Sequence, residues 1–323
     1  MASPYFRFFD LRMAEGITLT GQLAIQWTAN EINKFLNKAC GTENTDYIVY
    51  CDTDSAYVNL EKIVNQKVGN KSTEEKIRFM EKFSQEVLQK LITKATMNLG
   101  EYVNAYSPEK LQMKLEKACS SSVFVAKKRY ALKVHSSEGV IYKEPKISVT
   151  GLEIVRSSTP GVVKTKLKEA LLTIMDGTDK DLRKFITEYR SEYSKHNVNE
   201  IAFPRSVNGL QYYTGSPIYA KGCPIHVRAA LLYNHYIKKN KLESKYELIT
   251  EGSKIRFVYL KLPNHFRENV IGFVEKLPQE FNLQSYIDYD TMFKKSFIDP
   301  LQNIIDVLGW QLEERSSLED FFG

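Results

Sequence analysis

The sequence predicts an α+β fold: an antiparallel sheet with packed helices in the first half of the chain, followed by a mostly helical domain. In the first half, segments 47–60, 121–136 and 139–156 are rich in the β-branched and aromatic residues that favour strands. In the second half, apolar residues recur at the 3.6-residue period of helices. A chain of 323 residues is long enough for one large domain or two ordinary ones.

Two long helices are expected in the first half. Residues 11–40 keep a helical apolar period, Asp10 is a suitable N-cap, and Gly41 is placed to end the helix. Ser72 and Glu75 have the spacing of a capping box, which predicts the start of the second helix.

Between these helices, the stretch DYIVYCDTDSAYVNLEKIV has two carboxylates, Asp52 and Asp54, at a bend between short apolar strands over 47–50 and 56–60. Residues i and i+2 of a strand project from the same side, so two like charges are held close together. Their repulsion raises the pKa of both groups and costs stability unless a cation neutralises it. Carboxylate oxygens suit Mg²⁺, which often also binds substrate phosphates. The bend is therefore a structural turn, a metal site for a sugar nucleotide, or half of a polymerase active site.

The pattern changes from strand-like to helical at Pro160, and Pro is favoured in the first turn of a helix. We therefore place a domain boundary near Ser158. One strand-like patch, 255–260, interrupts the helical second half. Helices are predicted near residues 160–175, 179–195, 226–240 and 289–308.

The net charge of +6 is unevenly distributed along the chain. Residues 201–242 contain six basic residues and no acidic one, and residues 118–137 contain four basic residues and no acidic one. Such one-signed stretches favour a polyanionic partner. The alternative is a set of solvated surfaces balanced by acids elsewhere in the fold, and composition leaves both open.

Several classes of protein are disfavoured by what the sequence lacks. The four cysteines are scattered without a CxxC pair and the five histidines form no HExxH pattern, so neither a zinc site nor a disulfide framework is predicted. No apolar run approaches the roughly 20 residues of a membrane span, and the first residues lack the features of a signal peptide. We expect a globular protein of the cytoplasm with no membrane partner.

Two motifs resemble those of the family B DNA polymerases. YIVYCDTDSAYV is similar to their motif C hairpin, and AKKRYAL is similar to the KKRY motif that lines the path of the primer–template duplex. The stretches FRFFDLRMAEGITLTGQLAIQW, GLEIVRSSTP, KGCPIHVRAALLYN and SLEDFFG resemble, in order and spacing, the replicative polymerases of T-even-type bacteriophages. This resemblance implies the end of a palm domain over 1–158, a thumb over 159–315, a clamp-binding tail over 316–323, and a location in the cytoplasm of the infected host cell.

The resemblance also implies a reaction and a set of ligands. Asp54 would bind two Mg²⁺ ions together with a motif A aspartate, and Asp52 would lie beside them as a weaker participant. Motif A, the fingers motif B and the 3′–5′ exonuclease of the family do not occur in these residues. We therefore expect a separate polypeptide to supply them; a laboratory truncation is the alternative. Cys51 stands where the family usually has Gly, which reduces the freedom of the backbone at the bend.

The expected substrates are primer–template DNA and a dNTP, joined by attack of the primer 3′-hydroxyl on the α-phosphorus with release of pyrophosphate. Two alternatives belong to other classes of protein. The chain could be a non-catalytic module that binds duplex DNA and a sliding clamp. It could also be a metal-dependent glycosyltransferase, which would need a nucleotide-binding βαβ unit ahead of the two aspartates, where this sequence has one long helix.

Lys127, Lys128, Arg129 and Tyr130 are candidate DNA contacts, because the resemblance favours duplex binding over the alternative of a charged edge strand. Continuous strand alternation would put Lys128 and Tyr130 on one face and Lys127 and Arg129 on the other. The resemblance points to Lys128 with Tyr130 as the pair near the primer end. Contacts of this kind to phosphate carry no sequence preference.

Lys221, His226 and Arg228 are candidate contacts to primer-strand phosphates at the start of a predicted helix. A capping or core role for His226 is an equal alternative.

Leu318, Phe321 and Phe322 are at i, i+3 and i+4 and form one apolar face on a single helical turn. Such a turn favours docking into a groove of another protein, which the resemblance implies is the sliding clamp. Docking onto this chain's own second domain is the alternative.

Overall fold

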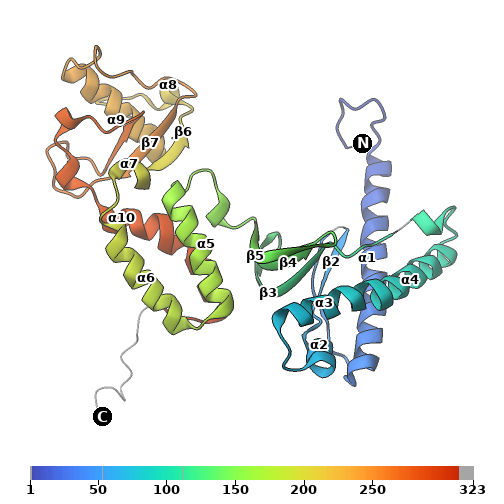
Figure 1. The fold of residues 1–323 in the computed structure, drawn as a ribbon. Helices are drawn as coiled ribbons and strands as arrows, with labels where there is room; N and C mark the ends of the chain where they lie inside the picture. Colours follow the sequence, from blue (N-terminus) through green and yellow to red (C-terminus); the bar gives the residue numbers. More distant parts are fainter. Residues whose placement is uncertain (1, 53, 111, 313–323) are drawn as a thin grey trace, which may run out of the picture. The chain divides into compact units, whose positions relative to one another are not determined.

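The structure is a computed structural model that describes residues 2–52, 54–110 and 112–312. Helices and three small sheets alternate along the chain (Figure 1). The strand orders are β1–β2, β3–β4–β5 and β6–β7–β8. The predicted α+β class is confirmed. Within the described residues, none of the helices combines the length and apolarity that crossing a bilayer requires.

The chain divides into two compact units. Unit 1 comprises Met1–Ser121 and Lys133–Lys146, and unit 2 comprises Ser122–Leu132 and Ile147–Gly323. This division falls within the three-stranded sheet β3–β4–β5, whereas the sequence placed a domain boundary near Ser158. The sheet is formed by β3 (Lys117–Ala126), β4 (Arg129–Ser137) and β5 (Val140–Thr150).

Unit 1 is built around one long helix. Its remaining elements follow in chain order as a hairpin and a series of helices. The elements are α1 (Leu11–Cys40), β1 (Ile48–Asp52), β2 (Ser55–Val58), α2 (Glu61–Val68), α3 (Thr73–Phe83) and α4 (Gln89–Tyr102).

The predicted ends of α1 are confirmed. The Asp10 side chain accepts hydrogen bonds from the backbone N–H groups of Arg12 and Met13, as an N-cap does. Gly41 adopts φ 62° and donates its N–H to the carbonyl of Asn37, which closes the helix in a left-handed cap.

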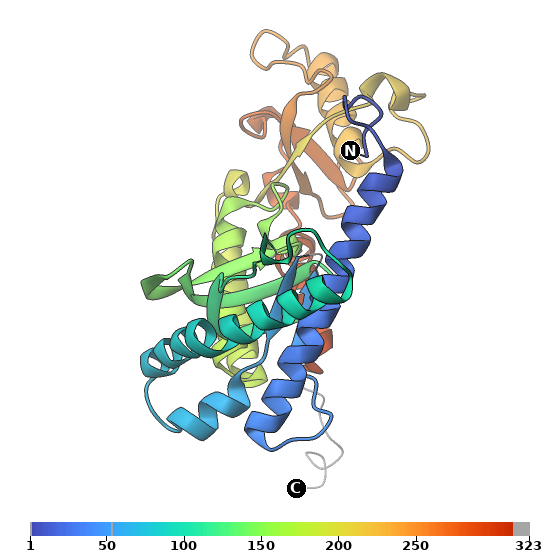
Figure 2. The same ribbon diagram turned by 90° about the vertical axis from the view of Figure 1, so that its right-hand side faces the viewer.

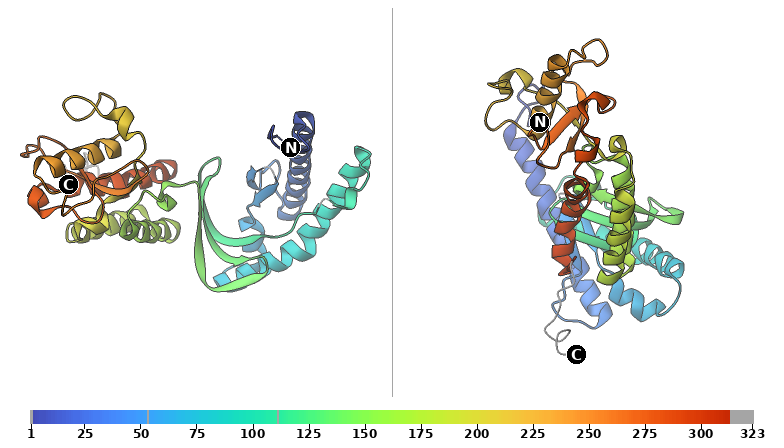
Figure 3. Two further views of the ribbon diagram at one scale, coloured as in Figure 1. Left: turned by 90° about the horizontal axis from the view of Figure 1, so that it is seen from above. Right: turned by 90° about the vertical axis from the view of Figure 1, so that its left-hand side faces the viewer.

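The second long helix begins at the predicted capping box, in which Ser72 and Glu75 exchange side-chain and backbone hydrogen bonds. A π-helical segment, Ser84–Leu88, joins α3 to α4 without a break, and Figure 3 shows the three as one rod. The short helix α2 was not predicted, because its eight residues are mostly polar and give a weak apolar period.

The core of unit 1 forms where α1, the hairpin, α2 and the α3–α4 rod meet. Buried side chains from all of these elements contact one another there. They are Ile32, Leu36, Cys40, Tyr47, Leu60, Ile63, Val64 and Leu88. Every residue in this set from α1 belongs to its C-terminal half.

Unit 2 contains the helices predicted from periodicity and a sheet that was only partly predicted. The strand-like patch at 255–260 is the central strand β7, while β6 and β8 are four residues each, too short to give an alternating pattern. The elements are α5 (Gly161–Asp176), α6 (Asp179–Tyr193), α7 (Val198–Ile201), β6 (Phe203–Ser206), α8 (Leu210–Tyr213), α9 (Ile225–Lys239), β7 (Lys254–Tyr259), β8 (Val270–Phe273), α10 (Tyr289–Phe293) and α11 (Asp299–Leu308).

Helix α9 packs directly on β8, which is buried along its whole length. A Cβ atom added at Gly272 would lie 3.0 Å from the carbonyl of Ala229, so only glycine permits this close approach of the two backbones. On the other side of unit 2, the rings of Tyr189, Tyr193 and Phe297 are buried against one another, with centroids 4.8 Å apart for Tyr189 and Phe297.

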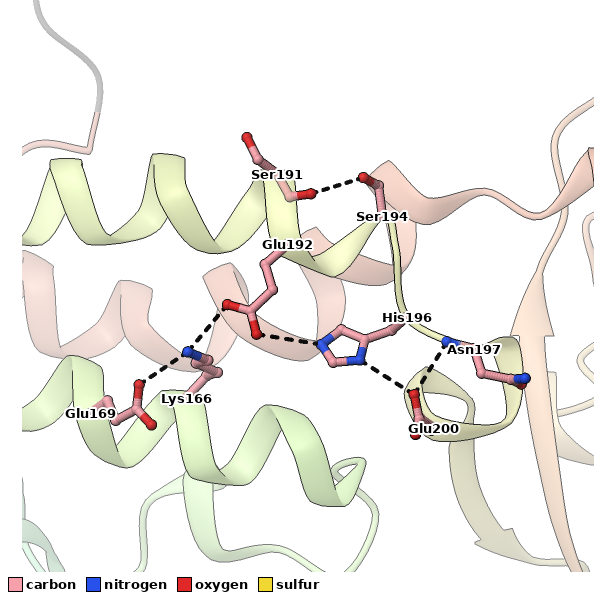
Figure 4. Close-up of polar contacts among 8 residues, drawn as sticks. All are labelled: Lys166, Glu169, Ser191, Glu192, Ser194, His196, Asn197 and Glu200. Atoms are coloured by element: carbon pink, nitrogen blue, oxygen red, sulfur yellow. Dashed lines mark hydrogen bonds and ion pairs between the residues drawn. The ribbon is translucent and has the colours of Figure 1, made fainter.

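A chain of polar contacts links α5, α6 and α7 (Figure 4). The Lys166 ammonium lies 3.3 Å from Glu169 and 3.2 Å from Glu192, while His196 lies between Glu192 and Glu200 at 3.9 and 3.3 Å. Partial burial acts to lower the pKa of Lys166, but its hydrogen bonds to Glu192 and Glu169 raise that pKa overall. These contacts connect the three helices at their surface.

Candidate active site

The two aspartates lie at the tip of the β1–β2 hairpin. The strands are antiparallel, with Tyr50 opposite Tyr57, Cys51 opposite Ala56 and Asp52 opposite Ser55. Only residues 53 and 54 connect the strands, so Asp54 belongs to the turn itself. The predicted bend between two short strands is confirmed, with β1 extending as far as Asp52.

Two asparagines of α1 hold the base of this hairpin. The Asn33 carboxamide accepts the backbone N–H of Tyr47 at 2.8 Å and donates to Asp46 at 2.8 Å. Asn37 donates to the carbonyl of Thr45 at 2.8 Å and accepts that residue's N–H at 3.0 Å. Together with the buried Tyr47 ring, these bonds fix the segment that leads into β1, and sequence periodicity gave no sign of them because both residues are polar.

The hairpin tip is accessible. Asp54 is exposed, Asp52 is half-buried, and within the described parts of the chain Asp54 makes no hydrogen bond or ion pair. Carboxylate oxygens are the ligand type that Mg²⁺ prefers. No group of three or more His, Cys, Asp or Glu residues able to hold a metal lies within the described residues. The two aspartates therefore fit part of a magnesium ligand set.

Cys51 precedes this pair in β1. Its backbone is extended, with φ outside the left-handed region, so a residue with a side chain is accommodated where the resembling family usually has Gly. Burial raises the pKa of the Cys51 thiol, and the nearby carboxylate of Asp46 adds to this effect.

The candidate DNA contacts of unit 2 begin with a tight turn. Lys127 and Lys128 are both exposed and form the two-residue connection between β3 and β4. Lys128 adopts φ 59°, so the chain reverses there. The prediction that strand alternation runs through residues 127–130 is therefore wrong, because the KKRY motif crosses a turn and only Arg129 and Tyr130 belong to a strand.

Gly151 supports this turn from the end of β5. It adopts φ +65°, and a Cβ atom there would lie 1.9 Å from the carbonyl oxygen of Lys128. The backbone of the turn can take its position only because residue 151 has no side chain. In β4, which follows the turn, the Tyr130 ring lies 5.4 Å from the Phe124 ring of β3.

Helix α9 holds two of the other candidates. His226 is half-buried in its first turn, where burial and then the positive charge of Arg205 lower the pKa of the imidazole. Arg228 donates to Asn269 at 2.6 Å and lies over the Tyr219 ring at 5.6 Å. Lys221, in the loop before the helix, is exposed.

Arg205 was not singled out by the sequence. It is exposed on β6, and its charge acts on both His226 and Tyr259. Its position in the acid-free stretch 201–242 was the only available signal. Arg205 and the start of α9 form one positive region, because the first turn of that helix contains no acidic residue. The clamp candidates Leu318, Phe321 and Phe322 lie outside the described residues.

Comparisons with known proteins agree with the motifs. Residues 40–193, which include the hairpin and the KKRY turn, match the family described as Divergent Family B DNA polymerase. The chain is 32% identical to the DNA-directed DNA polymerase of Enterobacteria phage T4, over 99% of this chain and 36% of the relative. It is 31% identical to that of Escherichia phage RB69, over 100% of this chain and 37% of the relative.

A more distant relative, a DNA polymerase of Methanocaldococcus jannaschii, is 25% identical over 96% of this chain. The resemblance to T-even-type family B polymerases is thereby confirmed. The chain spans little more than a third of the length of the two phage relatives.

Proposed function

We propose that this chain, similar along its length to part of a T-even-type family B DNA polymerase, supplies the motif C half of a two-metal nucleotidyl-transfer site. The observation that supports this most directly is the exposed carboxylate of Asp54, in the turn of a hairpin whose sequence resembles motif C. The comparisons favour a polymerase over a glycosyltransferase, since the matched family and the relatives described above are all named DNA polymerases.

The reaction would join a dNTP to a primer. The primer 3′-hydroxyl attacks the α-phosphorus, the new ester bond forms, pyrophosphate leaves, and the hydroxyl proton passes to solvent. Two Mg²⁺ ions, when bound, would lower the pKa of the attacking hydroxyl and neutralise the leaving oxygens. Asp54 would hold both ions and Asp52 would assist, while Asn33 and Asn37 keep the hairpin in place.

Two carboxylates are too few for this task, because a two-metal site needs further acidic ligands. We infer that a separate polypeptide donates the motif A aspartate and also holds the fingers and exonuclease. The relatives are nearly three times longer than this chain, so their remaining length is sufficient for these parts.

Unit 2 would hold the duplex. The exposed Lys127 and Lys128, together with Lys221, can reach phosphates without reading sequence. Arg228 is already bonded to Asn269 and stacked on Tyr219, so we assign it a supporting role beside the phosphate contacts.

The test is reconstitution of synthesis. The 323-residue chain is mixed with the motif A polypeptide of the same genome, expressed separately, and primer extension is measured with and without Mg²⁺. We expect extension that depends on both polypeptides and on the metal, and that Asp54→Ala abolishes. Duplex binding that persists without any synthesis would instead identify a non-catalytic DNA-binding and clamp-tethering module.

The clamp contact is a separate proposal that rests on the sequence of residues 316–323 and its resemblance to the family's tail. Removing these residues should shorten the products made in the presence of a sliding clamp and leave synthesis without the clamp unchanged. Equal product lengths with and without the tail would contradict it.

A further inference from the structure

The first turns of α1 and the segment before them expose an unusual amount of apolar surface. Of the eighteen large apolar side chains exposed in the described part of the chain, nine belong to residues 5–23. We call this the α1 apolar surface. Its main contributors are each between 45% and 63% exposed: Phe8, Leu11, Met13, Ile17, Leu19 and Leu23.

This surface continues the stripe of α1 that is buried in the core of unit 1. Ala24 and Thr28 are buried on that stripe, and Ile17 lies two helical turns before Ala24 on the same side. The other elements of unit 1 cover α1 only as far as Trp27. The Trp27 ring stacks on Tyr102 at the end of α4, with centroids 6.1 Å apart. In Figures 1 and 2 the first turns of α1 project beyond the other elements of unit 1.

The charged residues at the start of the helix are Arg12 and Glu15, and the exposed part of the helix beyond them is uncharged. No charged residue occurs between Glu15 and Glu31, so fifteen consecutive helical residues are apolar or neutral. Leu19 and Leu23 form an i, i+4 pair on a different side from Ile17, so apolar groups occur on more than one side. A helix of this kind is usually buried on all sides, and an exposed apolar patch of this extent marks an interface.

We propose that the α1 apolar surface binds the polypeptide that carries motif A, an inference that rests on the proposed function. Three observations favour this occupant. Nearly two thirds of the length of the phage relatives lies outside this chain, so a large amount of protein is available to cover the surface. Residues 5–23 have no net charge, since Arg7 and Arg12 are balanced by Asp10 and Glu15, and such a surface does not suit DNA, which binds through positive charge. The same helix also holds the hairpin through Asn33 and Asn37, so docking on α1 brings the partner to the element that presents Asp54.

The geometry of α1 makes this coupling direct. Ile17 and Asn33 are sixteen residues apart on one uninterrupted helix, a separation of about 24 Å along its axis. A partner bound to the first turns is therefore attached to the same rigid rod as the catalytic hairpin. Binding of the partner would therefore cover the apolar surface and complete the active site at the same time.

The experiment compares two equally exposed sites. The double variant Ile17→Glu/Leu23→Glu places charges in the α1 apolar surface, and Val140→Glu on β5 is the matched control, since Ile17 and Val140 are both 61% exposed. The probe is the motif A polypeptide of the same genome, expressed separately, and its dissociation constant is measured by calorimetry. We expect the double variant to raise this constant at least ~100-fold and the control to change it less than ~3-fold. Hydrogen exchange of the wild-type chain should show protection of residues 5–23 when the probe binds.

Several outcomes would overturn the proposal. Equal affinities of the double variant and the control would do so, as would failure of the wild-type chain to bind the probe. A wild-type dimer that the double variant dissociates would assign the surface to a second copy of this chain.

Different results would contradict the proposed function and the docking surface. If the wild-type pair binds but makes no DNA, the polymerase proposal is wrong while the docking surface stands. If synthesis requires both polypeptides and the double variant binds and extends normally, the docking surface is wrong while the polymerase proposal stands. Asp54→Ala should bind the probe with wild-type affinity in every case.

Discussion

Unit 1 and unit 2 differ in how completely each buries its own apolar side chains. Fifteen of the eighteen large apolar side chains exposed in the described residues belong to unit 1, and three belong to unit 2, which has more described residues. In unit 2, aromatic rings such as Tyr189 and Phe297 are packed out of solvent between helices. The sequence of unit 2 thus specifies a complete interior, while part of the apolar surface of unit 1 has no cover within the described chain.

The candidate sites differ in the same way. Asp54 in unit 1 is exposed and makes no bond within the described residues, whereas Arg228 in unit 2 is bonded to Asn269 and stacked on Tyr219. A side chain that is held by contacts within its own unit supports the structure, while an exposed carboxylate without a bond among the described residues is available to another molecule.

The largest expected effect tests this contrast at the hairpin. In the reconstituted pair, Asp54→Ala should reduce the rate of primer extension at least about 1,000-fold, because the proposed ligand of both metal ions is lost. Asp52→Ala should reduce it less, and Glu43→Ala, at an exposed acid of the same unit, should leave it unchanged. Thermal unfolding should be similar for Asp54→Ala and Glu43→Ala, since an exposed carboxylate that makes no bond within the described residues does not support the fold. A larger loss of rate with Asp52→Ala than with Asp54→Ala would reverse the assigned roles.

The second prediction concerns the KKRY turn of unit 2. Gly151→Ala would place a Cβ 1.9 Å from the Lys128 carbonyl, which must then move. We expect a loss of about 2–4 kcal/mol in unfolding free energy and at least a tenfold weaker affinity for duplex DNA. Gly139→Ala is the matched control, because Gly139 also has a positive φ, +82°, but has open space around it. Equal losses in the two variants would show that backbone strain, and not the contact with the turn, is responsible.

The third prediction concerns the base of the hairpin. Asn37→Ala removes the bonds that fix Thr45 to α1, and should cost about 1–3 kcal/mol of unfolding free energy. Primer extension should fall further than this loss of folded protein explains, because the hairpin is less well positioned. Asn30→Ala, at an exposed position of the same helix, should change neither quantity. A loss of stability with unchanged activity per folded molecule would show that Asn37 supports the fold but does not position the active site.

Features that depend on local chemistry could be predicted from the sequence. The caps of α1 and the capping box at Ser72 and Glu75 were correct because each is decided by a few neighbouring side chains. The hairpin bend was correct for the same reason. Features that depend on contacts far apart in the chain were missed, as with the support of the KKRY turn by Gly151 and the close packing of Gly272 on α9. Their signal is the absence of a side chain, which no periodic pattern reveals.

The smallest expected effect concerns His226. Burial and the charge of Arg205 lower its pKa in the folded chain, so the unfolded chain holds its proton up to a higher pH. The neutral imidazole therefore contributes stability above pH about 6.5, and this contribution is lost as the pH falls through the lowered pKa. A phosphate beside the ring would act in the opposite direction, because it favours the protonated form.

We therefore expect the pKa of His226, followed by NMR, to rise when duplex DNA binds, and affinity to increase modestly from pH 7.5 to pH 6. His226→Gln should remove most of this pH dependence and change the affinity at pH 7.5 little, since the ring is already neutral there. If the pKa stays low in the complex and the pH dependence persists in His226→Gln, the imidazole serves the packing at the start of α9. Arg205, whose charge acts on the imidazole, and Lys221, in the loop before α9, would then be the exposed cations to test for the phosphate contact.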